Sequence, residues 1–277
     1  MTRLSDFVAN RSLEQIYDEG WGPAVLDPFA EDFKNYVSAG DVVLDVGCGT
    51  GIVTLLAAEA AGPEGQVVGI DPTGFLLDRA RSKTPAYPVK WIDTNVEDMP
   101  FDENTFDVVL CHQTFQYVED PAAGMAAMKH VAKQGGTIAV SVWSPVEMQI
   151  PVRDLEDLIA QHISPEVSTL HAFSFGGLDK LSGLASDAGL DVRFAGTVSK
   201  PTEYDSVGAC VELMLAGAGR PLPDGSLGMG LFDLEDPAYE RGVEDLIAAL
   251  EIRWADYTRN GRLIVPYFTD VVVAQKQ

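Results

Sequence analysis

The sequence has few cysteines, few basic residues and no long apolar run, and each shortage argues against a class of protein. The only cysteines in 277 residues are Cys48, Cys111 and Cys210, and their wide spacing argues against a disulfide framework or a thiolate zinc site. Without a run of about 18 apolar residues, no membrane insertion is expected. The N-terminus also lacks the apolar block of a secretory signal, which predicts a cytoplasmic protein.

Basic residues are scarce: 19 stand against 42 acidic ones, for a net charge of −23. Such a chain would repel nucleic-acid backbones, so no nucleic-acid partner is expected. The acidity is consistent either with a strongly solvated surface or with adaptation to high salt, where ions screen the repulsion between carboxylates. No HExxH motif or tight histidine and carboxylate cluster occurs, so no metal site is expected; a scattered magnesium site among the abundant carboxylates is the alternative. Nothing in the pattern indicates an oligomeric state.

What the sequence does contain is an alternation of short β-branched runs with helix-compatible segments, which is typical of βαβ units and a parallel sheet. Gly135 and Gly136 are expected to break the chain before a fifth strand. Strands are predicted at 41–46, 66–71, 89–94, 106–112 and 136–143, helices at 51–61, 121–133, 153–163 and 177–188, and a final strand pair or hairpin arm at 263–276.

A glycine-rich stretch, VLDVGCGTG (43–51), lies where the first strand meets a helix. Its glycines, Gly47, Gly49 and Gly51, permit positive φ and let a ligand approach the backbone near the N–H groups of the helix N-terminus. A dinucleotide fingerprint would place its third glycine at position 52, where Ile52 stands. Pyrophosphate recognition is therefore disfavoured, and a tight turn without a ligand is the alternative.

The second predicted strand ends at Asp71, where an acid can accept hydrogen bonds from two ribose hydroxyls. The same residue could cap the helix predicted in PTGFLLDRA, and the two roles are compatible. The acid at the strand end therefore indicates a ligand that contains a nucleoside, and it gives no indication of a phosphate group.

In order and separation, these stretches resemble the class I S-adenosylmethionine-dependent methyltransferases, in particular the branch with the ubiquinone and menaquinone biosynthesis methyltransferases. VLDVGCGTG is similar to the family's first motif, GPEGQVVGID (62–71) to its second strand, and NVEDMPFDENTFDVV (95–109) to the segment between the adenine pocket and the fourth strand. FDVVLCHQTFQYVEDP (106–121) and GGTIAVSVW (135–143) resemble the fourth and fifth strands.

The resemblance implies a doubly wound α/β, Rossmann-like fold: a seven-stranded, mostly parallel sheet with helices on both faces and a helical cap. It implies an N-terminal helical lid over 1–40, a cofactor-binding core over 41–143, and cap and substrate segments over 144–277 whose last two strands complete the same sheet. The cofactor would be S-adenosylmethionine, and S-adenosylhomocysteine the product.

The resemblance also assigns candidate cofactor-binding residues. The three glycines would pass beneath the methionine and ribose, with Asp45 helping to place them and the cofactor's ammonium group, and Asp71 would hold the ribose. The other candidates line the adenine (Asn95, Val96 and Glu97), lie beside the methionine moiety (His112 and Gln113) or close over the cofactor (Tyr17 and Trp21).

Histidine is the usual base when a methyl acceptor must lose a proton, and His112 is the first candidate for a catalytic residue. A hydrogen-bonded structural histidine at a strand end is the alternative for His112. His162 and His171, in the predicted cap, are further candidates, whereas His130 is expected to be structural.

The sequence departs from the quinone branch after the fourth strand, where Gln116 and Tyr117 replace an arginine-asparagine pair, so quinone ring methylation is disfavoured. Apolar cap segments such as 203–217 favour a small hydrophobic acceptor, methylated on oxygen or carbon, although helical Leu and Met can equally be core. A non-catalytic cofactor-binding or regulatory protein is the alternative function. A dehydrogenase, the third hypothesis, is disfavoured by Ile52.

Overall fold

The computed structural model describes residues 12–83, 85–217, 219–221, 227–229 and 237–277, so the first part of the predicted lid, 1–11, lies outside the described residues. The chain divides into two compact units, which we describe separately. Unit 1 comprises residues 1–25, 145–174 and 199–267, and unit 2 comprises 26–144, 175–198 and 268–277.

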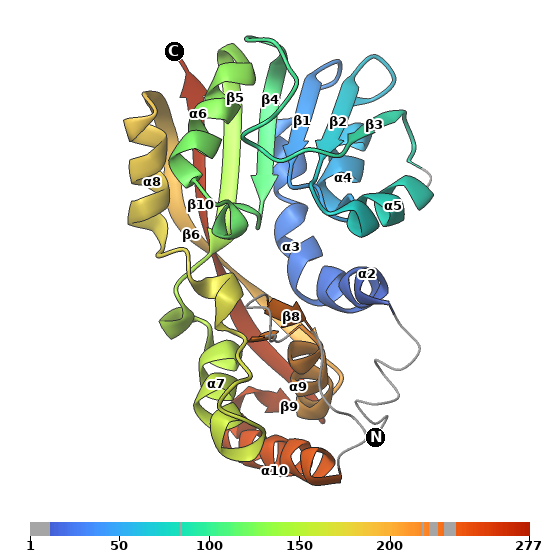
Figure 1. Ribbon diagram of the computed structural model, residues 1–277, viewed down its shortest axis with the longest axis vertical. Helices are drawn as coiled ribbons and strands as arrows, with labels where there is room; N and C mark the ends of the chain where they lie inside the picture. Colours follow the sequence, from blue (N-terminus) through green and yellow to red (C-terminus); the bar gives the residue numbers. More distant parts are fainter. Residues whose placement is uncertain (1–11, 84, 218, 222–226, 230–236) are drawn as a thin grey trace. The chain divides into compact units, whose positions relative to one another are not determined.

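Unit 2 is built on one twisted sheet with the strand order β3-β2-β1-β4-β5-β10-β6 (Figure 1). The short strand β9, which pairs with β10 off this path, belongs to unit 1, and the chain of β6 and β10 continues into that unit. The first five strands pair in parallel, whereas β10 pairs antiparallel with β5. This arrangement confirms the predicted seven-stranded, mostly parallel sheet. The strands are β1 (Val42–Val46), β2 (Gln66–Ile70), β3 (Val89–Ile92), β4 (Phe106–His112), β5 (Ala132–Trp143), β6 (Leu190–Tyr204), β9 (Thr258–Arg259) and β10 (Arg262–Lys276).

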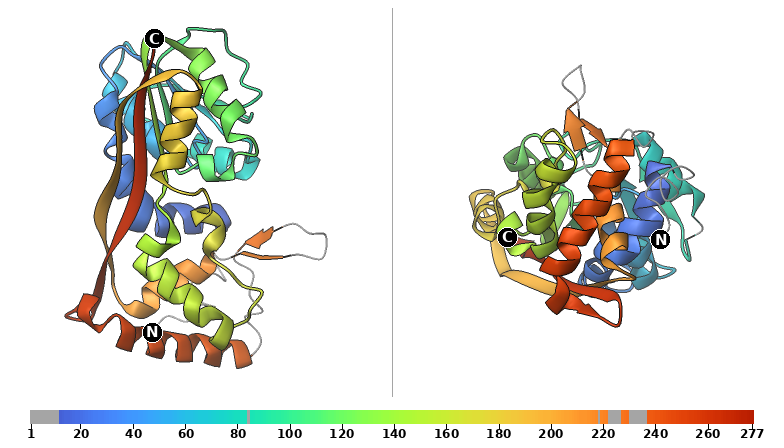
Figure 2. Two further views of the ribbon diagram at one scale, coloured as in Figure 1. Left: turned by 90° about the vertical axis from the view of Figure 1, so that its left-hand side faces the viewer. Right: turned by 90° about the horizontal axis from the view of Figure 1, so that it is seen from below.

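Helices cover both faces of this sheet because its central strands are apolar on both sides. On one face, α3 (Asp27–Ala30), the 3₁₀ helix η2 (Phe33–Tyr36) and α4 (Ile52–Ala61) pack on alternate residues of β1, β2 and β4. On the other face lie α6 (Pro121–Val131) and α8 (Leu178–Asp187) (Figure 2), which bury Met125, Met128 and Leu181. Two further helices, α5 (Gly74–Ser82) and the 3₁₀ helix η3 (Phe115–Tyr117), follow β2 and β4.

The glycine pair before the fifth strand does not break the chain, and that prediction was wrong. Strand β5 begins at Ala132 and contains both Gly135 and Gly136. Its pairing with β4 shifts between Phe106 and Val108, and Gly135 has a φ of +75°. The left-handed glycine therefore produces an irregularity of the β-bulge type inside a longer strand. Residues 263–276, predicted as a final strand pair or hairpin arm, lie in the single strand β10, which pairs antiparallel with β9 across the turn at Asn260 and Gly261 and is therefore one arm of a hairpin.

Unit 1 is mostly helical. Its helix α9 (Val207–Ala216) is buried along most of its length, so the apolar residues of 203–217 contribute largely to core packing. The Trp254 indole donates a hydrogen bond of 2.9 Å to the buried Asp154 carboxylate, which also pairs with two arginines. The remaining elements are α2 (Leu13–Ile16), the π-helix η1 (Tyr17–Leu26, which ends in unit 2), η4 (Val146–Met148), α7 (Ile150–His162), η5 (Leu170–Phe173), β7 (Gly219–Pro221), β8 (Leu227–Met229), α10 (Pro237–Arg253) and η6 (Ala255–Tyr257). No helix in the described ranges is long and apolar enough to cross a membrane.

Candidate functional site

The strand order reverses between β1 and β4, and in doubly wound sheets the carboxyl ends of strands at such a point form the ligand site. The glycine-rich loop leaves β1 at this point and enters α4. All three glycines have left-handed backbones, with φ of +68° at Gly47, +53° at Gly49 and +89° at Gly51. Gly51 precedes α4, so the helix begins at Ile52, one residue later than predicted.

The three glycines differ in what surrounds them. A Cβ on Gly47 would lie 2.1 Å from the methyl carbon of Thr114, and one on Gly51 would lie 2.7 Å from the Trp91 ring. A Cβ on Gly49 would meet no atom within 4 Å. Gly47 and Gly51 therefore make room for other parts of the protein, whereas Gly49 leaves open space in which a ligand can approach the backbone.

Asp71 holds the loop from the end of β2. Its Oδ2 accepts a hydrogen bond of 2.8 Å from the Gly49 N–H, and its Oδ1 accepts one of 2.8 Å from the Thr73 N–H. Only 6% of the residue is exposed. Since a carboxylate oxygen can accept two hydrogen bonds, each oxygen can still bind a hydroxyl after these contacts.

Asp45, the acid before the loop, lies beneath it. The residue is 1% exposed, and its Oδ2 accepts a hydrogen bond of 2.5 Å from the Thr54 hydroxyl in α4. Burial raises the pKa of Asp45 to about 7, the Thr54 hydrogen bond opposes this shift, and the charge of Asp71 adds to it. Asp45 therefore joins β1 to α4, which agrees with a part in placing the glycines.

The last residue of β4, His112, and the first residue after it, Gln113, lie at the same edge of the sheet. His112 Nδ1 lies 2.7 Å from the Ser141 hydroxyl of β5, and its ring packs against Phe33 with centroids 5.0 Å apart. Gln113 has a φ of +54°, which is rare outside glycine and is strained. Its side chain is buried and donates to the Thr269 hydroxyl at 2.7 Å. A strained residue beside a strand end is a common feature of ligand sites.

The predicted adenine segment is a tight turn after β3. The Asn95 side chain bonds the backbone and side chain of Asp98, at 2.7 and 3.0 Å, and Val96 is buried in the core. Glu97 is exposed. Because both ends of the Asn95 amide are used within the turn, the backbone is the part of this segment best able to contact a ring edge.

The remaining candidates belong to unit 1. Tyr17 and Trp21 lie in the π-helix η1, where Trp21 packs against Gly217: a Cβ on that glycine would come within 2.9 Å of the indole. His171 lies in η5, and burial lowers its pKa, with the nearby Glu156 charge opposing the shift. His162 ends α7. In unit 2, His130 is exposed on α6.

Four contributing residues were missed from the sequence: Thr50, Thr114, Gln116 and Ser141. The Thr50 hydroxyl and the Gln116 carboxamide oxygen are buried and, within the described part of the chain, have no hydrogen-bond partner. Buried polar atoms usually have partners, so these two atoms fit a site for a polar ligand. No group of three or more histidine, cysteine or acidic residues in the described ranges could hold a metal ion.

Comparisons with known proteins agree with this geometry. A family model described as a methyltransferase domain matches residues 44–140. A demethylmenaquinone methyltransferase of Bacillus licheniformis is 33% identical over 168 residues, which cover 56% of this chain and 72% of the relative. An uncharacterised methyltransferase of Schizosaccharomyces pombe is 36% identical over 112 residues, but these cover only 37% of this chain and 40% of the relative.

Two solved structures show the same fold. A Bacillus halodurans protein described as a methyltransferase matches with a TM-score of 0.57 at 16% identity, over 89% of this chain and 98% of that chain. A SAM-dependent methyltransferase of Aquifex aeolicus matches with a TM-score of 0.50 at 20% identity, over 67% of this chain and 92% of that chain. The matched segment contains the glycine loop, Asp71 and the turn after β4. The chain therefore belongs to the S-adenosylmethionine-dependent methyltransferases, whose cofactor is S-adenosylmethionine.

Proposed function

We propose that this chain transfers the methyl group of S-adenosylmethionine to a small hydrophobic molecule, at an oxygen or a carbon atom. The observation that carries the proposal is the environment of Gly49, whose N–H is fixed by Asp71 and whose Cα faces open space. The Bacillus licheniformis relative is named for a demethylmenaquinone substrate, which supports a hydrophobic acceptor for this chain as well. Gln116 and Tyr117, which replace the arginine-asparagine pair of the quinone branch, favour a different acceptor from a quinone.

The cofactor supplies a methyl group that is already activated on a sulfonium sulfur, so the protein has mainly to position and desolvate the reactants. Gly47, Gly49 and Gly51 would lie beneath the methionine and ribose, and the Asp71 carboxylate would accept hydrogen bonds from the ribose hydroxyls. The backbone of 95–97 would contact the adenine. Gln113, with Asp45 below the loop, would shape the methionine end, and Tyr17 and Trp21 would close over the cofactor.

Two buried polar atoms at this edge of the sheet, those of Thr50 and Gln116, support the same assignment. The Gln116 carboxamide oxygen is an acceptor suited to an ammonium group or a hydroxyl. The Thr50 hydroxyl, which can donate or accept, belongs to the glycine loop itself. Both atoms would regain the hydrogen bonds that burial removes when a polar ligand binds.

His112 would remove the acceptor's proton if the acceptor is a phenol or an enolisable carbon. The hydrogen bond to Ser141 sets the tautomer of the ring. When Nδ1 donates its proton to the Ser141 oxygen, Nε2 carries the lone pair and can act as the base; when Ser141 donates, Nε2 carries the proton instead. We assign His112 the first state, with Ser141 as the residue that positions it.

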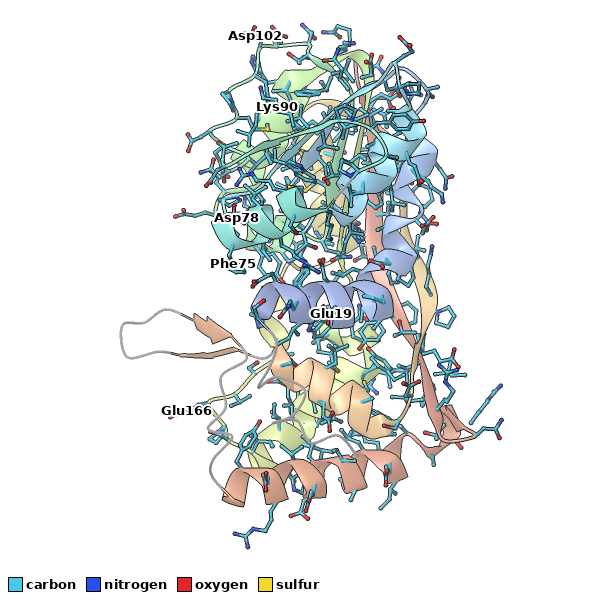
Figure 3. All side chains as sticks on the ribbon, turned by 90° about the vertical axis from the view of Figure 1, so that its right-hand side faces the viewer. Glu19, Phe75, Asp78, Lys90, Asp102 and Glu166 are labelled. Atoms are coloured by element: carbon cyan, nitrogen blue, oxygen red, sulfur yellow. The ribbon has the colours of Figure 1, made fainter. Side chains whose placement is uncertain are left out.

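The test is transfer of labelled methyl from S-adenosylmethionine to fractionated extract of the source organism by the purified chain. We expect label in the organic-soluble fraction with the wild type and with Asp78→Ala, and none with Asp71→Ala. Asp78 is a matched control because it is an exposed acid on α5 (Figure 3), where it pairs with Arg81. A thermal melt of each variant separates loss of binding from loss of fold.

His112 has its own test once an acceptor is known. His112→Gln should lower kcat strongly, abolish the pH dependence of the reaction near neutrality and leave the affinity for S-adenosylmethionine within about threefold. Binding of the cofactor without label in any fraction would instead favour a binding or regulatory protein.

A further inference from the structure

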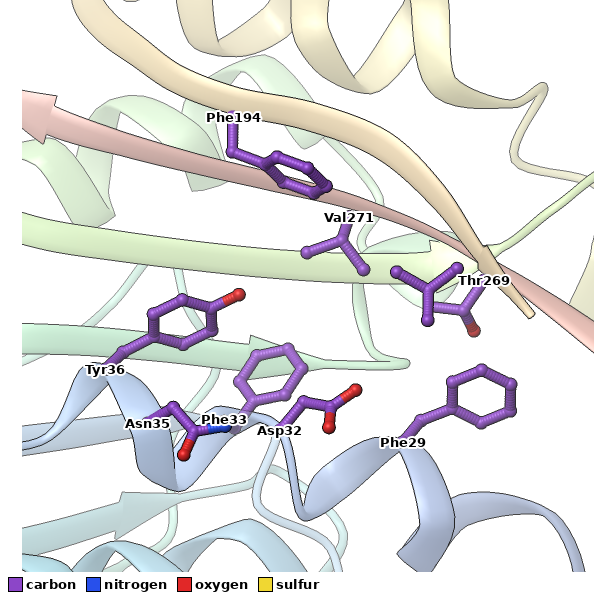
Figure 4. Close-up of a pocket in the computed structure, with 9 residues that line it drawn as sticks. Phe29, Asp32, Phe33, Asn35, Tyr36, Phe194, Thr269 and Val271 are labelled. Atoms are coloured by element: carbon purple, nitrogen blue, oxygen red, sulfur yellow. The ribbon is translucent and has the colours of Figure 1, made fainter. Parts of the chain in front are cut away.

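Unit 2 contains a cavity of about 230 Å³ on the face of the sheet that α3 and η2 cover. It is separate from the glycine loop, and nothing in the methyl-transfer proposal uses it. Figure 4 shows the side chains from α3, η2, β6 and β10 gathered around this space. The lining residues are Phe29, Asp32, Phe33, Asn35, Tyr36, Phe194, Val198, Thr269 and Val271.

Four of the nine lining residues are aromatic. Phe33 is buried and meets Tyr36 edge to face, with centroids 5.9 Å apart and planes at 89°. Phe194 of β6 closes the opposite side and is 47% exposed, which is unusual for a phenylalanine. The faces of aromatic rings carry partial negative charge, and several rings around one space attract a cation.

The polar groups of the cavity also favour positive charge. Asp32 contributes a carboxylate, Asn35 and Thr269 contribute neutral groups, and none of the nine residues is basic. Burial raises the pKa of the Tyr36 hydroxyl, and the negative charge of Asp32 adds to the shift, so this charge acts within the cavity.

These properties distinguish between classes of ligand. An anion would be repelled by the Asp32 carboxylate, and a neutral apolar molecule would gain nothing from its charge. A small, strongly hydrated cation would lose its water against the apolar rings without sufficient replacement. A methylated ammonium group is weakly hydrated, apolar at its surface and positive, and it satisfies the rings and the carboxylate together.

We propose that this aromatic cavity binds a small organic cation through a quaternary or methylated ammonium group. The cavity adjoins the residues of the candidate site without including them. Phe33 separates it from the His112 ring, and Thr269, which lines it, accepts the hydrogen bond from Gln113. A ligand in the cavity would therefore contact Phe33 and Thr269, which are the neighbours of His112 and Gln113.

The test is a calorimetric titration of the full chain with choline and with 3,3-dimethyl-1-butanol, its neutral analogue of nearly the same shape, at constant ionic strength. We expect saturable binding of choline and at least tenfold weaker binding of the alcohol. Phe194→Ala should weaken choline binding by about two- to fivefold, the range for loss of one cation–π contact. Asp32→Asn removes the Coulomb attraction to the ammonium charge and should weaken choline binding by about tenfold.

Phe75→Ala is the matched control, because Phe75 is also 47% exposed but projects from α5, away from the cavity lining (Figure 3). It should bind choline as the wild type does. Equal binding of choline and the alcohol would overturn the proposal in favour of an apolar hollow. No saturable choline binding, or choline binding that Phe194→Ala and Asp32→Asn leave unchanged while both remain folded, would also overturn it. None of these readouts depends on methyl transfer.

Discussion

Gly47 and Gly49 form a natural matched pair for testing the site, because both are left-handed and only one faces open space. Alanine at either position takes on an unfavourable backbone that costs roughly 1–2 kcal/mol. At Gly49 this backbone cost should be the whole loss of unfolding free energy. At Gly47 the new Cβ would also overlap Thr114, and overpacking of this kind costs about a further 1–3 kcal/mol.

The two substitutions should also differ in their effect on cofactor affinity, because only Gly49 faces the space assigned to the cofactor. Gly49→Ala places a methyl group in the space assigned to the cofactor, so it should weaken S-adenosylmethionine binding by about tenfold or more while the fold stays close to wild type. Urea unfolding gives the free energies, and isothermal titration gives the affinities. Adding Thr114→Gly to Gly47→Ala removes all three close contacts and should recover about 1–3 kcal/mol in a double-mutant cycle.

Two results would refute this reasoning. If Gly47→Ala and Gly49→Ala lose equal stability, Thr114 does not limit the space at Gly47. If Gly49→Ala binds S-adenosylmethionine with wild-type affinity, the cofactor does not pass over Gly49 and the observation that carries the proposed function is lost. Both variants are compared in the same buffer, since the chain carries a net charge of −23 and its stability depends on screening.

Two further predictions concern buried carboxylates. Burial raises the pKa of Asp45 to about 7, so between about pH 4 and 7 the folded chain keeps a proton that the unfolded chain has lost, and stability should fall as pH rises through that window. Asp45→Asn should remove this part of the slope in urea unfolding, and a slope identical to wild type would contradict the assignment. In unit 1, Trp254→Phe removes the indole donor to Asp154 and should lower the unfolding free energy by about 1–3 kcal/mol in the same assay. No loss would mean that the paired arginines alone satisfy Asp154.

Most of the sheet could be predicted because its signal is local. Runs such as 41–46 and 106–112 combine β-branched residues with strand length, and each lies within a residue of the observed β1 or β4. The bulge in β5 could not be predicted in the same way. A glycine pair that ends a strand and a left-handed glycine within one look alike in sequence, and the pairing partner decides between them.

The candidate site was only partly predictable for a related reason. Asp71 and the three glycines follow predicted strands directly, so their position at the carboxyl edge follows from topology. Thr114, Ser141 and Trp91 reach the same edge from other strands, and no local pattern distinguishes them from ordinary core residues. The cavity between η2 and β6 was still harder to predict from the sequence, because residues about 160 positions apart line it. The cofactor-binding and catalytic roles assigned to the residues of the candidate site, and to Asn95, Glu97, Tyr17 and Trp21, all stay predictions.

The three glycines of the loop share a spacing and a left-handed backbone, yet they are required for different reasons. Gly47 accommodates Thr114 and Gly51 accommodates Trp91, both of which are internal packing constraints. Gly49 alone combines open space with a backbone N–H held by an acid at the end of the next strand. In this glycine-rich motif, one glycine is therefore assigned to ligand binding and the other two to internal packing. The glycine spacing differs from a dinucleotide fingerprint at a single position, where Ile52 stands in place of the third glycine. The open space over Gly49 is a direct structural argument for a bound ligand.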